Sequence, residues 1–179
     1  MTWTGAAAID HDIRVQRVED HEWDIVAWLW QAFRQDLAPV VQGYPYADGR
    51  YQASLLGAFP SPDGEGYLAR RPHPNTGEDA PVGFALVDGL TGPIRSMAAF
   101  WITPPIRGSG FGSRFALEIL TGHPGPWQIG FQHDNAAAGT FWRRVAGLAF
   151  GRDWVETMEP VPGRPAAPPD HFIRSALPE

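Results

Sequence analysis

The 179-residue chain contains no cysteine, and it contains no lysine either, because all 14 of its Lys and Arg positions are arginine. Without cysteine there can be no disulfide, no thiolate nucleophile, no cysteine-ligated zinc and no acyl-cysteine intermediate. Without lysine there can be no Schiff-base chemistry and no phosphate loop of the GxxxxGK[ST] type, whose lysine is obligatory. An anionic ligand would therefore be held by backbone N–H groups and arginine alone.

Length and composition favour one folded domain. A chain of this length can bury about 70% of the surface that it exposes when unfolded. The 20 glycines and 18 prolines indicate many tight turns rather than disorder, because 44% of the chain is apolar and eight tryptophans need burial. We expect a flexible N-terminal tail over residues 1–12 and a single domain over 13–179.

The overall charge and the absence of long apolar runs set further limits. A net charge of −6 argues against a nucleic-acid-binding protein, which usually presents a basic face. No run approaches the roughly 18 apolar residues of a membrane span, and the first ten residues lack the features of a signal peptide. We therefore expect a cytoplasmic protein with no nucleic-acid partner and no membrane association.

Hydrophobic periodicity predicts a mixed sheet with flanking helices. Apolar side chains recur at a period of two in strands and of about 3.6 in helices. The predicted strands are 13–18, 65–71, 82–87, 97–102, 127–132, 154–158 and 172–175, and the predicted helices are 20–33, 51–59, 110–120 and 136–146. This order predicts an α/β (α+β mixed-sheet) fold, with an antiparallel part early and βαβ units later.

The stretch from Ala99 to Arg114 is the most informative part of the sequence, because it predicts a strand, a glycine-rich turn and a helix. Three glycines in the turn, Gly108, Gly110 and Gly112, leave backbone N–H groups bare and let a ligand approach closely. The helix N-terminus adds about half a positive charge. Together these features predict a cradle for a phosphate or pyrophosphate group.

Two common phosphate motifs do not fit this stretch, and the first of them, the GxxxxGK[ST] loop, fails because the chain has no lysine. The dinucleotide fingerprint GxGxxG would need a glycine where the chain has Ser113, and an acidic residue near Gln128. What the turn does contain is Arg-x-x-Gly-x-Gly, formed by Arg107, Gly110 and Gly112. This pattern resembles the pyrophosphate loop of the GNAT superfamily of acyl-CoA-dependent N-acyltransferases.

A second segment carries the same resemblance. After the next predicted strand, Asn135 to Trp142 is similar to the family's Asn-x-x-Ala-x-x-(apolar)-Tyr segment, which opens a helix. The order of predicted elements is also similar to the family over about residues 13–175. The chain thus resembles a bacterial, single-domain GNAT protein, which implies a central mixed sheet that splays between its fourth and fifth strands.

The resemblance implies that acetyl-CoA binds in that opening as a co-substrate. The pantetheine arm would pair with the backbone of 99–102, and a main-chain N–H near Ile102 would hold the thioester carbonyl as an oxyanion donor. The implied cofactor-binding residues are Trp101, Ile102, Arg107, Gly108, Ser109, Gly110, Phe111, Gly112, Ser113, Asn135 and Trp142. Asn135 also fits a plain helix N-cap, so both roles stay open.

The sequence departs from the family where a tyrosine usually protonates the departing CoA thiolate, because Trp142 stands there. An indole N–H can donate a hydrogen bond but does not release its proton near neutral pH. Another tyrosine, Tyr44, Tyr46 or Tyr51, can substitute, or water can, or the protein binds acyl-CoA without turnover. Tyr46 is our candidate among the three.

The general base is open as well. An amine is mostly protonated at pH 7, so a proton must be removed before it can attack. The predicted strand 97–102 contains no acid, and the candidates are Asp88, His133 and Asp134. His133 and Asp134 follow a strand that we expect to be central, at the end of the sheet where sites form in α/β folds. The six histidines show no metal-ligand spacing, so we expect no metal.

We therefore predict an N-acetyltransferase that moves an acetyl group directly to an amine of a small molecule or peptide. The acceptor pocket would be lined by Trp30, 44–48 and 160–169, and a homodimer is a candidate assembly. The first alternative is a catalytically silent acyl-CoA-binding or interaction module on the same fold. A nucleotide-binding module of unrelated fold is the other alternative.

Overall fold

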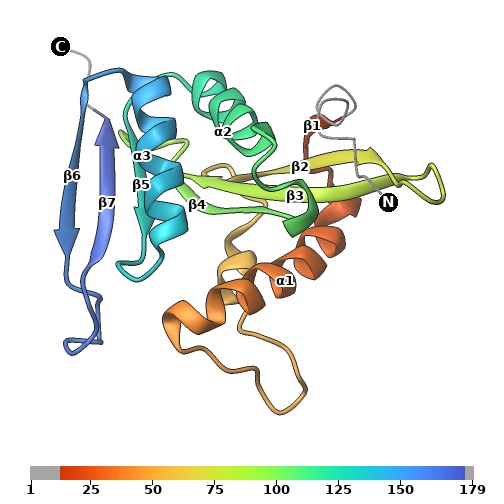
Figure 1. Cartoon of the computed structure of the whole chain (residues 1–179), viewed down its shortest axis with the longest axis horizontal. Helices are drawn as coiled ribbons and strands as arrows, with labels where there is room; N and C mark the ends of the chain where they lie inside the picture. Colours follow the sequence, from red (N-terminus) through yellow and green to blue (C-terminus); the bar gives the residue numbers. More distant parts are fainter. Residues whose placement is uncertain (1–12, 176–179) are drawn as a thin grey trace, which may run out of the picture.

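The computed structural model describes residues 13–175, and these form one seven-stranded sheet flanked by helices (Figure 1). The strand order is β1-β2-β3-β4-β5-β7-β6. The strands are β1 (Arg14–Arg17), β2 (Glu65–Pro72), β3 (Asp79–Asp88), β4 (Arg95–Ile102), β5 (Trp127–Phe131), β6 (Trp154–Glu159) and β7 (Asp170–Ser175). The α-helices are α1 (Trp23–Val41), α2 (Phe111–Gly122) and α3 (Ala136–Phe150). The predicted α/β class with a mixed sheet is confirmed.

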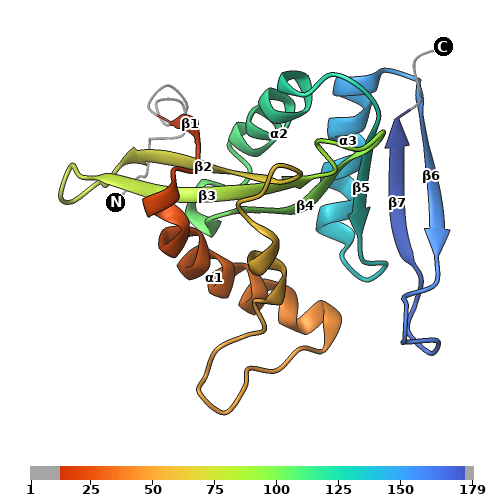
Figure 2. The same ribbon diagram turned by 180° about the vertical axis from the view of Figure 1, so that it is seen from behind.

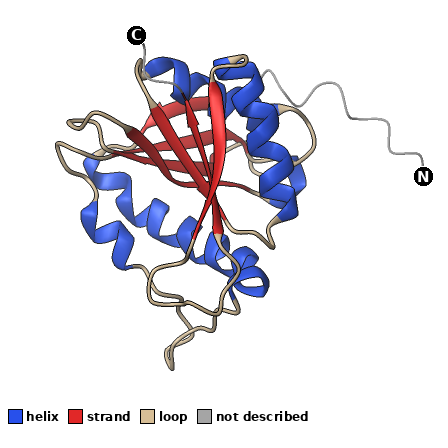
Figure 3. Cartoon of the chain, turned by 90° about the vertical axis from the view of Figure 1, so that its left-hand side faces the viewer, coloured by secondary structure: helices blue, strands red, loops and turns tan. Residues whose placement is uncertain are grey.

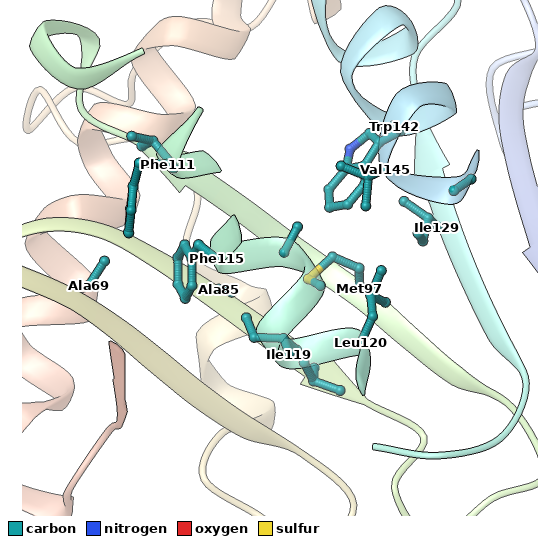
Figure 4. Close-up of a cluster of buried hydrophobic side chains, with 14 of the residues drawn as sticks. Ala69, Ala85, Met97, Phe111, Phe115, Ile119, Leu120, Ile129, Trp142 and Val145 are labelled. Carbon is teal, nitrogen blue, oxygen red and sulfur yellow. The ribbon is translucent and has the colours of Figure 1, made fainter. Parts of the chain in front are cut away.

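Helices cover both faces of the sheet, with α1 on one face and α2 and α3 on the other (Figures 1 and 3). Val26 and Trp30 of α1 pack with Phe84 of β3 in one buried cluster. A second and larger cluster joins α2 and α3 to the opposite face, and it buries a row of α2 side chains at i, i+4 and i+8, namely Phe111, Phe115 and Ile119. Figure 4 shows Phe115 and Ile119 of that row beside the strands. The sheet is thus held rigidly from both sides.

The only parallel pair in the described sheet, β4 with β5, opens along its length. The two strands pair over three positions, from Arg95 opposite Trp127 to Met97 opposite Ile129. The remaining five residues of β4 have no partner on β5, which runs instead beside β7. The predicted splay between the fourth and fifth strands is therefore present, and it exposes the last half of β4 on one side. Figure 2 shows the two strands from behind.

Two predictions about helices were wrong. Residues 51–59 do not form an α-helix; only a short 3₁₀ turn, Ser54–Ala58, lies there. Helix α1 does not end at residue 33, the predicted limit, but continues through Pro39 to Val41, and Gln42 takes a left-handed conformation that closes the helix end. Both errors fall where apolar spacing is weak and backbone capping decides the structure.

Residues 160–169 form a hairpin loop between β6 and β7, because these two strands pair antiparallel along six positions. Among residues 13–175, no helix is long and apolar enough to cross a membrane. The predicted tail over 1–12 lies outside the described residues.

Candidate functional site

The end of β4 presents main-chain groups to the opening in the sheet. The N–H of Thr103 donates to the carbonyl of Val82 at 2.9 Å, and Ile102 lies opposite Gly83. In an antiparallel pair, hydrogen-bonded residues alternate with residues whose main-chain groups point the other way. The N–H of Ile102 therefore points away from β3, toward the side that β5 has left.

A glycine-rich loop follows β4 and leads into α2. Gly108 and Gly110 have φ angles of +79° and +92°, which side-chain-bearing residues rarely adopt. A Cβ at either position would meet no atom within 4 Å, so the space in front of this backbone is open. Because the first N–H groups of an α-helix have no intrahelical partner, this loop and the start of α2 direct several donors into that space.

These elements border a cleft of about 440 Å³, which we call the β4–α3 cleft. Its lining residues are Phe100, Trp101, Ile102, Arg107, Gly108, Gly110, Gly112, Ser113, Ala137, Ala138, Phe141, Trp142 and Arg144. This lining includes two arginines and no acidic side chain. The cleft is therefore suited to an extended ligand that carries negative charge at the glycine-rich end.

The cleft is aromatic beside α3. The ring of Trp142 lies 5.2 Å from that of Phe100 and 4.8 Å from that of Phe141, edge to face in both pairs. Trp142 is almost wholly buried, and Figure 4 shows it on α3 above the core. The indole thus forms an apolar wall at the position of the expected tyrosine.

Arg107 fixes the loop to the end of β4. Its Nε donates to the carbonyl of Ile102 at 2.7 Å, and its Nη2 donates to Asp36 of α1. Asp36 also accepts from the indole N–H of Trp101 at 2.8 Å. Burial by itself raises the pKa of Asp36, but the hydrogen bonds from Arg107 and Trp101 outweigh it and hold that pKa below its ordinary value. The guanidinium thus anchors the loop, while the loop's main chain borders the cleft.

A second cavity, of about 560 Å³, lies at the carboxyl end of β5, and we call it the β5-end cavity. It is bordered by the end of α1, the β6–β7 loop and the residues that follow β5. The lining residues are Val40, Val41, Gln42, Gln132, His133, Asp134, Val161, Arg164, Pro165, Ala166, Ala167, Pro168 and Asp170. Residues 132–134 line this cavity and 137–138 line the β4–α3 cleft, so one short segment borders both.

Solved structures share the fold of this chain, although no protein-family model and no curated protein matches it. The ribosomal-protein-S18-alanine N-acetyltransferase of Escherichia coli is 9% identical at a TM-score of 0.62, covering 93% of this chain and 95% of its own. NAA60 of Arabidopsis thaliana, solved with a bisubstrate analogue, is 12% identical at a TM-score of 0.61, covering 93% and 99%. A GNAT-family acetyltransferase of Staphylococcus aureus Mu50 is 11% identical at a TM-score of 0.56, covering 93% and 99%.

The chain has the GNAT fold. The alternative of a nucleotide-binding module of unrelated fold was therefore wrong.

Three of the predicted cofactor-binding residues do not line the β4–α3 cleft, and their side chains pack or bond within the protein. The Ser109 hydroxyl donates to the carbonyl of Ile106 at 2.8 Å and accepts from the N–H of Phe111 at 3.3 Å. Phe111 is fully buried. Asn135 caps α3 by accepting from the N–H of Ala138 at 3.1 Å. In this GNAT fold these three side chains build the frame of the cleft, and the other predicted cofactor-binding residues line it.

The predicted catalytic side chains lie in three separate parts of the structure. His133 and Asp134 line the β5-end cavity, whereas Tyr46 lies in a separate hollow with Asp24 and Trp28. Asp88 lies opposite Ser96, at the far end of β4 from the opening. The structure thus brings His133 and Asp134 together and leaves Asp88 and Tyr46 apart from them.

Sequence reasoning missed several lining residues of the cleft. Ala137, Ala138, Phe141 and Arg144 come from one face of α3, and Phe100 comes from β4. The helical spacing of the α3 residues was the signal that could have found them, since positions i, i+1, i+4 and i+7 share a face. The two alanines are small enough to let a ligand lie against the helix.

Proposed function

We propose that this protein is an acetyl-CoA-dependent N-acetyltransferase. The observation that carries the proposal is the opening between β4 and β5, which ends at a glycine-rich loop and a helix N-terminus. The arginines and the absence of acidic groups in the described lining agree with a polyanionic ligand. The structural neighbours named above, which include N-acetyltransferases, support the same reading by analogy of fold.

The residues present fit coenzyme A. The backbone of 107–112 and the start of α2 would hold the pyrophosphate, because a Cβ at Gly108 or Gly110 would meet no atom within 4 Å and the first N–H groups of a helix have no intrahelical partner. The main chain of β4 would pair with the pantetheine arm. When bound, acetyl-CoA supplies an activated acetyl group on a thiolate leaving group.

The main-chain N–H of Ile102 would stabilise the charge that develops on the thioester oxygen. Such a donor is fixed before the reaction and needs no reorganisation, which makes this type of stabilisation strong. The amine of a small molecule or peptide would enter from the β5-end cavity and attack directly, since the chain has no cysteine to carry the acetyl group. His133 and Asp134 border that cavity and are the candidate bases.

Isothermal titration calorimetry with acetyl-CoA and with CoA tests the binding half of this proposal. We expect one site per chain with a Kd of about 1 µM–1 mM, the usual range for enzyme substrates. The separate measurement of thiol release over a panel of primary amines tests the enzymatic half. No binding of either compound at millimolar concentration would overturn the proposal.

A silent CoA-binding module on the same fold is the competing function. The favouring observation is Trp142, whose buried indole lines the cleft at the position where the resemblance implies a proton-donating tyrosine. A thiolate is a good leaving group, so water can perform this step. Amine-dependent thiol release above the buffer rate would exclude the silent module, whereas tight CoA binding with no release from any amine would establish it.

A further inference from the structure

Four side chains form a continuous hydrogen-bonded chain behind the β5-end cavity. Arg143 of α3 donates from Nε and Nη2 to the two oxygens of Glu156 on β6, at 2.8 and 2.7 Å. Oε1 of Glu156 lies 2.6 Å from Nδ1 of His171 on β7, and Nε2 of His171 lies 2.9 Å from Nδ1 of His133. The chain ends at His133, which lines the cavity.

The two imidazole rings are held by stacking as well. The ring of His171 lies flat on that of Phe131, with centroids 5.1 Å apart and planes 12° apart, and the ring of His133 lies 5.2 Å beyond. The side chain of His171 is only 12% exposed. His171 is therefore a fixed connector, while the exposed His133 is the end that a ligand can reach.

The charge of Glu156 determines which protons the imidazoles carry. The hydrogen bond from Arg143 lowers the pKa of Glu156 to about 2, with a further contribution from His171, so the group is a carboxylate at any working pH. A carboxylate only accepts, so Nδ1 of His171 carries the hydrogen of that bond. In neutral His171, Nε2 is then bare and accepts from Nδ1 of His133. Neutral His133 is thereby left with a lone pair on Nε2.

No group among residues 13–175 bonds to Nε2 of His133, and the His133 side chain lines the β5-end cavity. Nor do any three His, Asp or Glu side chains in that range surround a common point as metal ligands would. His133 thus has Nδ1 held by His171 and Nε2 bare. This is the arrangement of a general base with a positioning partner.

We propose that His133 is the general base of the acetyl transfer and that His171 and Glu156 are positioning residues, which fix its reactive tautomer. This proposal rests on the proposed function. Nε2 of His133 takes one proton from the acceptor's ammonium group, which leaves the nitrogen with a free electron pair. That pair forms the C–N bond to the thioester carbon, and the C–S bond breaks with its electron pair going to sulfur. The second proton lost by the nitrogen neutralises the CoA thiolate, and His133 returns its proton to water.

Several charged groups surround His133. His171 lies behind it on β7, with Glu156 and Arg143 beyond, and these last two largely cancel each other's charge. Asp134 is its neighbour in sequence, and the cavity lining also holds Arg164 and Asp170. Burial raises the pKa of Asp170 even though Arg164 and His171 oppose it. The acids of the lining are suited to attract a cationic amine toward His133.

The first test is kinetic and uses His133→Gln, with His21→Gln as the control. His21 lies in the turn before α1 and its side chain is 77% exposed. With an amine that the wild type acetylates, we expect His133→Gln to lower kcat by about 100-fold or more while the Kd of acetyl-CoA is unchanged. The deficit should shrink above about pH 10, where an alkylamine loses its proton unaided. His21→Gln should match the wild type throughout.

The second test separates the positioning residues from a merely structural role. Glu156→Gln and His171→Phe are compared with Glu159→Gln, which removes another ion-paired glutamate from the same strand. The nitrogen-15 spectrum of labelled histidine reports the tautomer of His133 directly. We expect the Nδ1–H form in the wild type and in Glu159→Gln, and a shift toward the Nε2–H form in His171→Phe, whose ring offers no acceptor. Glu156→Gln and His171→Phe should both lower kcat, and by less than His133→Gln does.

The outcomes distinguish the two proposals. Wild-type kcat in His133→Gln at pH 7, while the wild type turns over, would overturn the role of His133 alone. An Nε2–H tautomer in the wild type would overturn the roles of His171 and Glu156. Absence of turnover with every amine by the wild type would overturn the proposed function, and this inference with it.

Discussion

The Gly110→Asp variant is expected to lose at least about 100-fold in affinity for acetyl-CoA. Gly110 is the N-cap residue of α2, with a φ of +92° and open space where a Cβ would stand. An aspartate at an N-cap places its carboxylate on the first N–H groups of the helix, which are the groups that would hold the pyrophosphate. The aspartate side chain would therefore occupy the pyrophosphate position, and its negative charge would also repel the ligand.

The matched control for this variant is Gly77→Asp in the β2–β3 turn. Gly77 also has a positive φ, +72°, and its Cβ position is also open. Both variants place an aspartate at a position with a positive φ and add the same charge, so a comparison of their melting temperatures reveals any loss of folding. Titration calorimetry should then show normal acetyl-CoA binding in Gly77→Asp only. Wild-type affinity in Gly110→Asp would remove the glycine-rich loop from the site.

Much of the β4–α3 cleft could be predicted from the sequence because its determinants are local. A strand, a turn with three glycines and a helix occupy about 16 consecutive residues, and backbone N–H groups need no distant partner to face a ligand. The same holds for Trp142, because its helical spacing from Asn135 places it on the same side of α3, two turns further along. The GNAT resemblance rested on these short segments, and the fold agrees with it.

The hydrogen-bonded chain behind His133 could not be predicted in this way. His171 lies 38 residues after His133, and Glu156 lies between them, 15 residues before His171. They meet only because β7 inserts between β5 and β6, an order that periodicity does not specify. The end of α1 was missed for a related reason, since Gln42 rather than a glycine takes the left-handed closing conformation.

A buried ion pair joins Arg70 of β2 to Glu22, the residue that precedes α1. Nη2 of Arg70 donates to Oε1 of Glu22 at 2.8 Å, and both side chains are less than 10% exposed. Glu22 also accepts from the N–H of Glu19 at 3.0 Å and from Gln16 at 3.2 Å. The pair thus joins the start of α1 to the centre of the antiparallel sheet.

We expect Arg70→Met to lower the free energy of unfolding by about 3–5 kcal/mol, because the Glu22 carboxylate would stay buried without its partner. Arg14→Met is the control, since the Arg14–Asp79 pair has a similar length of 2.7 Å but side chains that are 67% and 42% exposed. Loss of that pair should cost about 1 kcal/mol or less. Urea denaturation at pH 7 measures the free energy of unfolding of both variants. Equal losses in Arg70→Met and Arg14→Met would show that burial of the Glu22 pair does not increase the cost of breaking it.

The pH dependence of the Arg70→Met effect follows from the pKa of Glu22. Burial by itself raises that pKa, but the Glu19 backbone hydrogen bond and Arg70 outweigh burial and hold it below the ordinary value of 4.5. A carboxyl group with a lowered pKa in the folded state stabilises the protein above its unfolded pKa and loses that contribution as the pH falls. The difference between wild type and Arg70→Met should therefore be largest near neutral pH and shrink below pH 4.5. The double variant Glu22→Leu/Arg70→Met should recover much of the loss at pH 7, because it leaves no buried charge without a partner.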